Sequence, residues 1–188
     1  MTPTVPPAPA SKSSNNTVLI IVLVLVGFFM FCACLGVVAA IAIPNYLKFT
    51  NRARMAECKM NLKAVYTAQK AHFAEHDDFG DTAEIIGFKI SSASTRYTYF
   101  GGPELIVMPT AAGALPVDED QLPGLLGGEL PGVNGECPDD CTFVGACVGN
   151  IDSDAALDVW SISTKPREHN GKPIQAGEPF HDVDDLTE

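Results

Sequence analysis

Acidic side chains are absent from the first 56 residues of this 188-residue chain. The basic residues in that segment are Lys12, Lys48, Arg52 and Arg54. Residues 57–188 instead carry 23 acidic and 8 basic side chains, a net charge of −15. Because so acidic a domain repels nucleic acid and anionic lipid headgroups, the composition argues against nucleic-acid binding and is typical of a soluble surface domain.

Charge is also absent from residues 18–43, which form an apolar run of 26 residues. As a helix this run is roughly 39 Å long, which exceeds the ~30 Å hydrocarbon core of a bilayer. A signal peptide has a shorter apolar run and a small-residue cleavage site, which this segment lacks. Lipidation of Cys34 is disfavoured because Phe31-Cys32-Ala33 is a poor processing box. The sequence therefore predicts a retained membrane-spanning helix over residues 17–44.

Large apolar side chains are nearly absent from residues 1–16, which contain four prolines and only Val5 as a sizeable apolar residue. Such a segment cannot bury a core, so we expect a disordered N-terminal tail. Residues 45–188 would then form a globular head that follows the membrane helix.

Two signals disagree on which side of the membrane the head lies. More basic residues follow the apolar run than precede it, and the positive-inside rule would place the head in the cytoplasm. The cysteines beyond the membrane segment, three of them within CPDDCTFVGAC (residues 137–147), instead suggest an oxidising compartment. We give the cysteines more weight and expect the tail in the cytoplasm and the head outside it.

The pattern changes from uniformly apolar to amphipathic after Pro44. A proline costs a helix one hydrogen bond and introduces a kink, which membrane-embedded helices tolerate. Beyond it, residues on one helical stripe recur every three or four positions. This stripe comprises Met55, Cys58, Leu62, Val65, Tyr66, Gln69 and Phe73. We expect the helix to continue over residues 45–78 and to end at Asp77-Asp78-Phe79-Gly80, with Gly80 as its C-terminal cap.

Several segments of the chain resemble type IV pilins. The runs GVVAAIAIPNY (residues 36–46) and NLKAVYTAQKAHFAEHDDF (residues 61–79) are similar to the hydrophobic and amphipathic halves of the pilin N-terminal helix. The run GNIDSDAALDVWSI (residues 149–162) agrees with the same family. The resemblance implies an α+β fold in which a long helix packs on a small antiparallel sheet. It also implies polymerisation into surface filaments with the helices inward.

The residues that mark pilin processing are absent from the matching positions. Pilins are cut after a glycine and before a phenylalanine, and they carry a glutamate five residues into the mature chain. Counted back from Pro44, these three positions hold Val22, Leu23 and Gly27, and the Gly27-Phe28 pair is out of register. In the family, that glutamate pairs with the N-terminus of a neighbouring subunit. Its absence argues against orderly packing in a filament core.

Residues 79–163 are expected to hold a sheet of short strands joined by loops rich in glycine and proline. The predicted strands are residues 95–100, 104–108, 142–148 and 157–163. Trp160 is expected in the core. Residues 109–140 contain five prolines, which favours a long surface loop that could carry recognition. Residues 164–188 are predicted to be irregular, with a solvated acidic end rather than one that binds a basic partner.

Four cysteines could form disulfides in the head, and they are Cys58, Cys137, Cys141 and Cys147. Cys147 shares a face of its predicted strand with Phe143, and Cys58 lies on the core-facing helical stripe. A Cys58–Cys147 bond is therefore conceivable, with Cys137–Cys141 closing a small loop, but four cysteines allow three pairings. Cys58 and Cys147 could equally be buried free thiols. Cys32 and Cys34 lie in the apolar run and are expected to act as apolar filler.

One motif resembles a zinc site. His72-Phe73-Ala74-Glu75-His76 matches H-x-x-E-H, in which two histidines point the same way from a helix and the glutamate can act as a base. The motif lies at the end of the pilin-like helix, in a head too small for a protease fold. We therefore interpret these residues as part of a solvated face.

A second motif resembles the start of a calcium loop because oxygen-bearing side chains occupy alternating positions. These residues are Asn150, Asp152, Asp154 and Asp158. Ala155 stands where a glycine usually makes the sharp turn, and Ser161 stands where a bidentate glutamate would lie. The alternative, which we favour, is a polar hairpin turn in which the side chains cap backbone N–H groups. Calcium is the one cofactor that the sequence suggests.

The sequence shows no nucleophile–base set, phosphate loop or convincing metal cluster, so we expect no enzyme. It predicts a single-pass pilin-like structural protein, held in the bacterial inner membrane by residues 18–43, with its head in the periplasm or on the cell surface. Its partners would be other pilin-like subunits or the pilus or secretion machinery. The alternative is a non-polymerising anchored module whose 109–140 loop binds a protein or polysaccharide.

Overall fold

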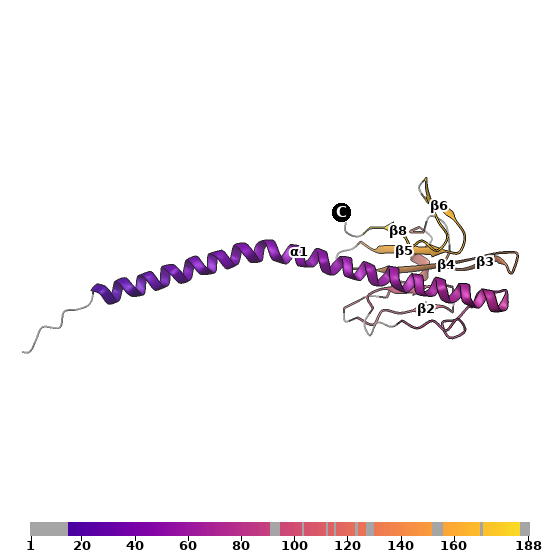
Figure 1. The fold of residues 1–188 in the computed structure, drawn as a ribbon, viewed down its shortest axis with the longest axis horizontal. Coiled ribbons are helices and arrows are strands. Elements are labelled where there is room, and N and C mark those ends of the chain that lie inside the picture. The colour runs from indigo at the N-terminus through magenta and orange to yellow at the C-terminus, as the bar shows by residue number, and fades with distance from the viewer. Residues whose placement is uncertain are drawn as a thin grey trace, which may run out of the picture. The chain divides into compact units, whose positions relative to one another are not determined.

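The computed structural model divides the chain into two compact units, residues 1–48 and residues 49–188. The structure describes residues 15–90, 95–102, 104–111, 113–114, 116–122, 124–126, 130–151, 156–169 and 171–184. One helix, α1 (Asn15–His76), runs through both units, so that each unit holds a part of it (Figure 1).

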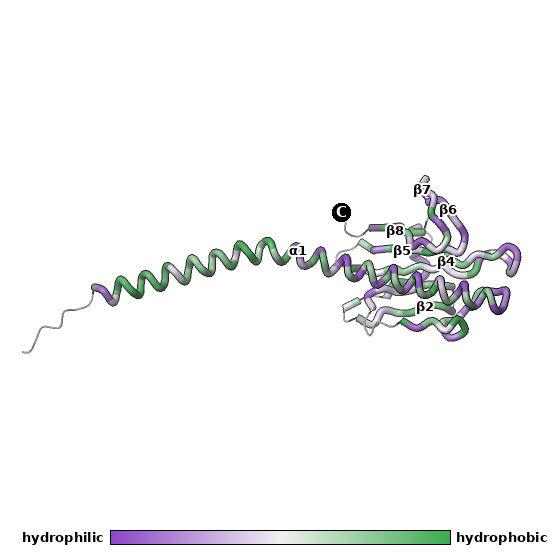
Figure 2. Tube along the Cα trace, viewed as in Figure 1, coloured by the Kyte–Doolittle hydropathy of each residue, from purple (hydrophilic) through white to green (hydrophobic). Residues whose placement is uncertain are grey.

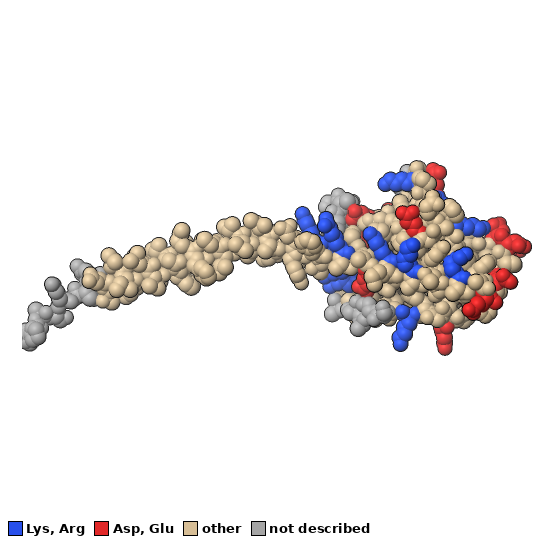
Figure 3. Space-filling model, in the orientation of Figure 1, with Lys and Arg blue, Asp and Glu red and all other residues tan. Residues whose placement is uncertain are grey.

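In the first unit α1 is apolar and exposed on all sides. Every side chain from residue 16 to residue 48 is exposed, and residues 16–47 carry no charge. Figure 2 shows mostly hydrophobic residues along this part of α1, and Figure 3 shows an uncharged, tan surface on the face in view. Pro44 lies within the helix and does not end it, as the sequence predicts. By its length and composition α1 could cross a membrane.

In the second unit the predicted stripe of α1 faces the core. Met55, Cys58, Leu62, Val65 and Gln69 are buried, while Tyr66 and Phe73 are half-buried. The basic residues Arg52, Lys59, Lys63 and Lys70 cover the exposed surfaces. Burial of each large apolar side chain of the stripe contributes roughly 1.5–3 kcal/mol, so packing rather than helix propensity holds this part of α1 in place.

The end of α1 differs from the prediction. The helix ends at His76 rather than at residue 78, and Asp77 adopts a left-handed conformation with φ of 57°, which an aspartate tolerates better than most residues. Gly80 is not the cap. Its N–H donates to the Gln69 side chain and its carbonyl accepts from the same amide, at 2.9 and 2.8 Å. A side chain on Gly80 would collide with Ile86, so this close approach requires a glycine.

The second unit contains an antiparallel sheet of six strands in the order β2-β1-β4-β5-β8, with β3 also paired to β4. The strands are β1 (Thr98–Phe100), β2 (Ile106–Val107), β3 (Gly132–Glu136), β4 (Asp140–Gly149), β5 (Asp158–Ser163) and β8 (Phe180–Val183). A separate two-stranded sheet pairs β6 (Arg167–His169) with β7 (Lys172–Ile174). The predicted α+β fold, a long helix on an antiparallel sheet, is confirmed (Figure 1).

The sheet buries both of its faces. On one face Tyr99, Cys147 and Trp160 pack with Cys58 and Leu62 of α1. On the other face, the alternate residues of the central strands pack with side chains from the segment between β2 and β3. This second group comprises Phe100, Ala146, Val148, Val159, Val117, Leu122 and Leu126. The helix thus covers one face, and the segment that precedes β3 covers the other.

Two predictions about irregular segments are wrong. Residues 109–140 are not one surface loop, because they include β3, the 3-10 helix η1 (Glu119–Gln121) and buried Leu122 and Leu126. Residues 164–188 are not wholly irregular, because they include β6, β7 and β8. These strands are short and polar, and the hydrogen bonds made when β6 pairs with β7 and β8 pairs with β5 outweigh their weak β-propensity.

Candidate functional site

Two disulfides fix the second unit. Cys58 of α1 joins Cys147 of β4 across 89 positions in sequence, with their Cα atoms 6.3 Å apart, and Cys137 joins Cys141 at the turn between β3 and β4. Of the three possible pairings, the structure has the one that the sequence analysis describes, in which Cys147 of β4 bonds to Cys58 of α1. Cys32 and Cys34 of the first unit are free thiols.

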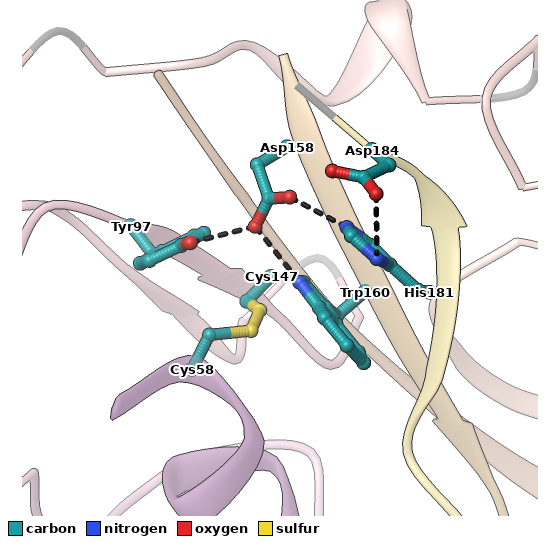
Figure 4. A network of polar contacts seen from close by, with 7 residues as sticks. All are labelled: Cys58, Tyr97, Cys147, Asp158, Trp160, His181 and Asp184. Atoms are coloured by element: carbon teal, nitrogen blue, oxygen red, sulfur yellow. Dashed lines mark hydrogen bonds and ion pairs between the residues drawn. A yellow bond between two sulfur atoms is a disulfide. The ribbon is translucent and has the colours of Figure 1, made fainter. Parts of the chain in front are cut away.

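A fully buried carboxylate lies at the start of β5, beside the Cys58–Cys147 disulfide (Figure 4). The Asp158 Oδ2 atom accepts hydrogen bonds from the Tyr97 hydroxyl at 2.6 Å and from the Trp160 indole N–H at 2.8 Å. Its Oδ1 atom lies 2.6 Å from His181 Nε2 of β8. Burying an unpaired carboxylate is costly, so these three contacts compensate for its lost hydration.

The His181 ring is held in one orientation by its neighbours. Trp160 and His181 are cross-strand partners, and their rings stack at 3.9 Å between centroids and 10° between planes. The Lys59 ammonium lies 3.9 Å from the centroid of the Trp160 ring, in a cation–π contact. His181 Nδ1 lies 3.9 Å from Asp184 Oδ2. Asp158, His181 and Asp184 therefore bring three atoms that can ligate a metal to within 4.8 Å of one another.

A second buried carboxylate lies on the neighbouring residue of β8. Asp182 accepts a hydrogen bond from the Ser161 hydroxyl, and Arg167 donates to the same hydroxyl. His169 Nδ1 lies 3.9 Å from Asp182 Oδ1. The prediction of a wholly solvated acidic end is therefore wrong for Asp182, whose side chain is buried. The carboxylates of Asp158 and Asp182 together fasten the C-terminal segment to β5.

Burial also affects one tyrosine in the core. The Tyr99 hydroxyl accepts a hydrogen bond from the Asn61 side-chain amide at 2.7 Å. Burial raises the pKa of Tyr99 above its usual value of 10.0, because the phenolate would lose its hydration there. At the exposed end of β4, a hydrogen bond from Lys165 to Asp140 at 2.9 Å lowers the pKa of that carboxyl.

The residues predicted to bind calcium are only partly described. Asn150 is half-buried directly after β4, and Asp158 is buried at the start of β5. Asp152 and Asp154 lie outside the described residues. Because both Asp158 oxygens already contact Tyr97, Trp160 or His181, a calcium ion would compete with this network. Calcium binding stays a prediction.

The zinc-like motif takes a local arrangement at the end of α1. The His72 and His76 rings stack at 4.2 Å between centroids, and His76 Nδ1 lies 3.1 Å from the His72 carbonyl oxygen. Glu75 is exposed. The sequence analysis missed His181 instead, because its segment was predicted to be irregular. No alternation of apolar and polar residues marks this strand, because His181 and Asp182 lie next to each other between Phe180 and Val183.

The positions that correspond to pilin processing lie on the exposed apolar part of α1. Val22 and Leu23 present apolar side chains there, and a side chain added at Gly27 would meet nothing within 4 Å. The structure thus places three uncharged residues, all without a hydrogen-bonding side chain, where the family has its cleavage site and glutamate. This part of α1 is therefore apolar and uncharged at all three positions.

Comparison with known proteins agrees with this architecture. No family model matches the chain. The chain is 33% identical to the type IV major pilin protein PilA of Myxococcus xanthus (strain DK1622), in an alignment that covers 70% of this chain and 74% of that protein. This similarity, and the long apolar N-terminal helix whose second part packs on an antiparallel sheet, show that the chain belongs to the type IV pilin family.

Proposed function

We propose that this protein is a membrane-anchored structural subunit or assembly component of a pilus or secretion machine, and that it acts through the apolar part of α1. The observation that carries the proposal is the exposed, uncharged surface of residues 18–43. A helix that is apolar on all sides is stable only in lipid or among other apolar helices. Both surroundings are found during the life of a pilin, first in the membrane and then in a filament.

In this proposal the protein is an uncut relative of the filament subunits. With Val22, Leu23 and Gly27 in place of the family's glycine, phenylalanine and glutamate, a prepilin peptidase has no cleavage signal in register with Pro44. The helix then stays in the membrane, where it associates with pilin helices through apolar packing alone. Such a protein anchors or initiates an assembly and does not fill its core.

The head lies outside the cytoplasm in this proposal, in the periplasm or on the surface of a bacterium. The two disulfides support this location, because such bonds form and persist in oxidising compartments. The acidic surface of the second unit is compatible with it. The basic residues that follow the apolar run argue for the opposite orientation and carry less weight, because positive charge biases topology without fixing it.

The intact mass of the protein extracted from its native membrane tests this function. We expect a full-length chain, and we expect the triple variant Val22→Gly, Leu23→Phe, Gly27→Glu to be shortened after residue 22, since it restores the family's signal. A native chain already shortened near residues 22–27 would contradict the proposal that the helix stays uncut and would indicate an ordinary filament subunit.

Co-purification then separates assembly from simple anchoring. We expect the full-length protein to cross-link to pilin-like subunits or to the basal machinery through Cys32 or Cys34, and a Cys32→Ala, Cys34→Ala variant to lose these products. Recovery only as an isolated membrane protein, with no such product in the native strain, would support the alternative of an anchored binding module.

A further inference from the structure

His181 is held in the manner of a metal ligand. Asp158 Oδ2 already accepts two hydrogen bonds, from the Tyr97 hydroxyl and the Trp160 indole, so this group acts as a carboxylate. The 2.6 Å contact with its Oδ1 atom is therefore a donation from His181 Nε2–H. In the neutral imidazole this assignment leaves the lone pair on Nδ1.

The Nδ1 lone pair faces another carboxylate oxygen. Asp184 Oδ2 is 3.9 Å from Nδ1, too far for a hydrogen bond. Two electron-rich atoms that face each other at this distance attract a cation between them. Ligand atoms about 2.1 Å from a tetrahedral zinc ion lie about 3.4 Å apart, so the pair would need to close by about 0.5 Å. The Asp184 side chain lies just after β8 and is 36% exposed.

We propose that His181 and Asp184 bind a transition-metal dication such as Zn²⁺, and that Asp158 is the outer carboxylate that orients His181. A metal-bound histidine usually donates its other ring N–H to a carboxylate, which fixes the tautomer and increases the basicity of the ligand. The stacking of His181 on Trp160 fixes the ring plane. Solvent reaches the 22%-exposed His181 side chain, and water completes the coordination.

The chemistry of the donors distinguishes this site from the predicted calcium loop. Calcium prefers a shell of oxygen atoms, whereas an imidazole with a carboxylate suits zinc, copper or nickel. The competing occupant is a proton on Nδ1, which would make His181 an imidazolium between Asp158 and Asp184. If a metal occupies this position, added Zn²⁺ should bind to the protein at constant pH; if a proton does, added Zn²⁺ should have no effect. An experiment can therefore distinguish the two.

Trp160 supplies the signal for that experiment. It is the only tryptophan of the chain and stacks directly on His181, so Cu²⁺ bound at Nδ1 should quench its fluorescence. The full-length protein in detergent would carry His72→Gln and His76→Gln, which remove the other adjacent pair of histidines. We expect saturable quenching by Cu²⁺, and relief of this quenching by Zn²⁺, which has no unpaired electron.

Two substitutions with the same change in charge provide the matched comparison. Asp184→Asn should raise the Cu²⁺ concentration for half-quenching about tenfold or more, whereas Glu75→Gln, on the exposed end of α1, should leave it unchanged. His181→Gln should abolish saturable quenching. Asp184 lies just beyond the end of β8, so Asp184→Asn removes the charge of the ligand at a position outside the strand.

The result that would overturn the proposal is equally direct. His181 and Asp184 do not form a metal site if Cu²⁺ quenches the Trp160 fluorescence of Asp184→Asn at the same concentration as in the parent protein. The same conclusion follows if Zn²⁺ fails to compete with Cu²⁺. The 3.9 Å contact between His181 and Asp184 would then be an ion pair without a metal. Either outcome leaves the proposed structural function untouched, since neither concerns the apolar part of α1.

Discussion

The two parts of α1 belong to one unbroken helix, yet they meet different surroundings. From residue 16 to residue 48 every side chain is exposed and almost all are apolar, whereas in the second unit the same helix buries one stripe and exposes its basic residues. Backbone hydrogen bonding makes both parts helical. The distribution of apolar side chains around the axis decides whether a helix suits lipid or a protein core. A charged substitution that an exposed position of the second part tolerates should therefore destabilise the first part in a membrane.

The largest effect is expected from the bond that ties α1 to the sheet. Cys58→Ala with Cys147→Ala opens a loop of 89 positions, and the chain-entropy model predicts a loss of about 4 to 5 kcal/mol in the free energy of unfolding. Cys137→Ala with Cys141→Ala opens a much shorter loop and should cost about 2 kcal/mol. Urea unfolding followed by Trp160 fluorescence measures both.

The free thiols of the first unit provide the control for this comparison. Cys32→Ala with Cys34→Ala should leave the unfolding midpoint of the head unchanged, because these residues form no bond and lie outside the second unit. Equal losses for the two disulfide variants would contradict the expected dependence on loop length.

A matched pair of methionines compares the two surroundings of α1. Met30 is 62% exposed in the first unit and Met60 is 68% exposed in the second. We expect Met30→Arg to weaken membrane insertion by about 2.5–3.5 kcal/mol, the apparent cost of an arginine near the middle of a membrane helix. Met60→Arg should change the stability of the head by less than about 0.5 kcal/mol, as for most surface substitutions.

A quantitative insertion assay and thermal unfolding of the full-length protein measure these two effects. The comparison fails if Met60→Arg also impairs insertion, or if Met30→Arg inserts as well as the parent chain. In that event the first part of α1 would have surroundings other than a bilayer.

Calcium would stabilise the second unit and leave the first unaffected. If Asn150, Asp152, Asp154 and Asp158 form a loop site, calcium at ten times its dissociation constant adds about 1.4 kcal/mol to the stability of the head. Millimolar calcium should then raise the melting temperature of the native protein, and Asp154→Ala should remove this increase. An identical midpoint with and without calcium would support the polar hairpin turn instead.

The smallest effect concerns Tyr99. Because burial raises its pKa, the folded state favours the neutral phenol, and this stabilisation is present below pH 10 and is lost as the pH rises through the folded-state pKa. Tyr99→Phe should cost about 1 kcal/mol at pH 7 for the lost hydrogen bond with Asn61. It should also make the melting temperature less sensitive to pH between 9 and 11.

The control for this prediction comes from the first unit. Tyr46→Phe, at an exposed ring of the first unit, should leave the alkaline melting profile of the second unit unaltered. A profile that is equally steep with and without the Tyr99 hydroxyl would show that another group controls alkaline unfolding.

Local pattern was enough to predict the helix, the passage through Pro44 and the stripe from Met55 to Gln69. It also found β4 and β5 to within two residues at either end, because these central strands are long or rich in β-formers. It failed for β3 and β8. The sequence of β3, GVNGE, has few residues that favour strands, and β8 carries polar side chains at its centre. Such strands exist because a partner strand supplies their hydrogen bonds: β3 pairs with β4, the next strand along the chain, and β8 pairs with β5.

The candidate sites divide in the same way. Regular spacing drew attention to His72, His76 and the oxygen-bearing residues from Asn150 to Asp158. The site that the structure assembles uses His181, which sequence spacing could not connect to Asp158 across 23 positions. Cross-strand pairing of β5 with β8 creates the stack on Trp160 and brings the buried carboxylate to the ring.

The sequence by itself determined that this protein has an uncharged helix long enough for a membrane, an amphipathic continuation and no pilin processing signal in register with Pro44. Each of these properties is local, since it depends on which side chains follow one another along a helix. Only the tertiary structure decided which segment covers the second face of the sheet, which cysteines pair and which histidine meets a buried carboxylate. Those outcomes depend on contacts between residues far apart in the chain, which form only when the whole core packs.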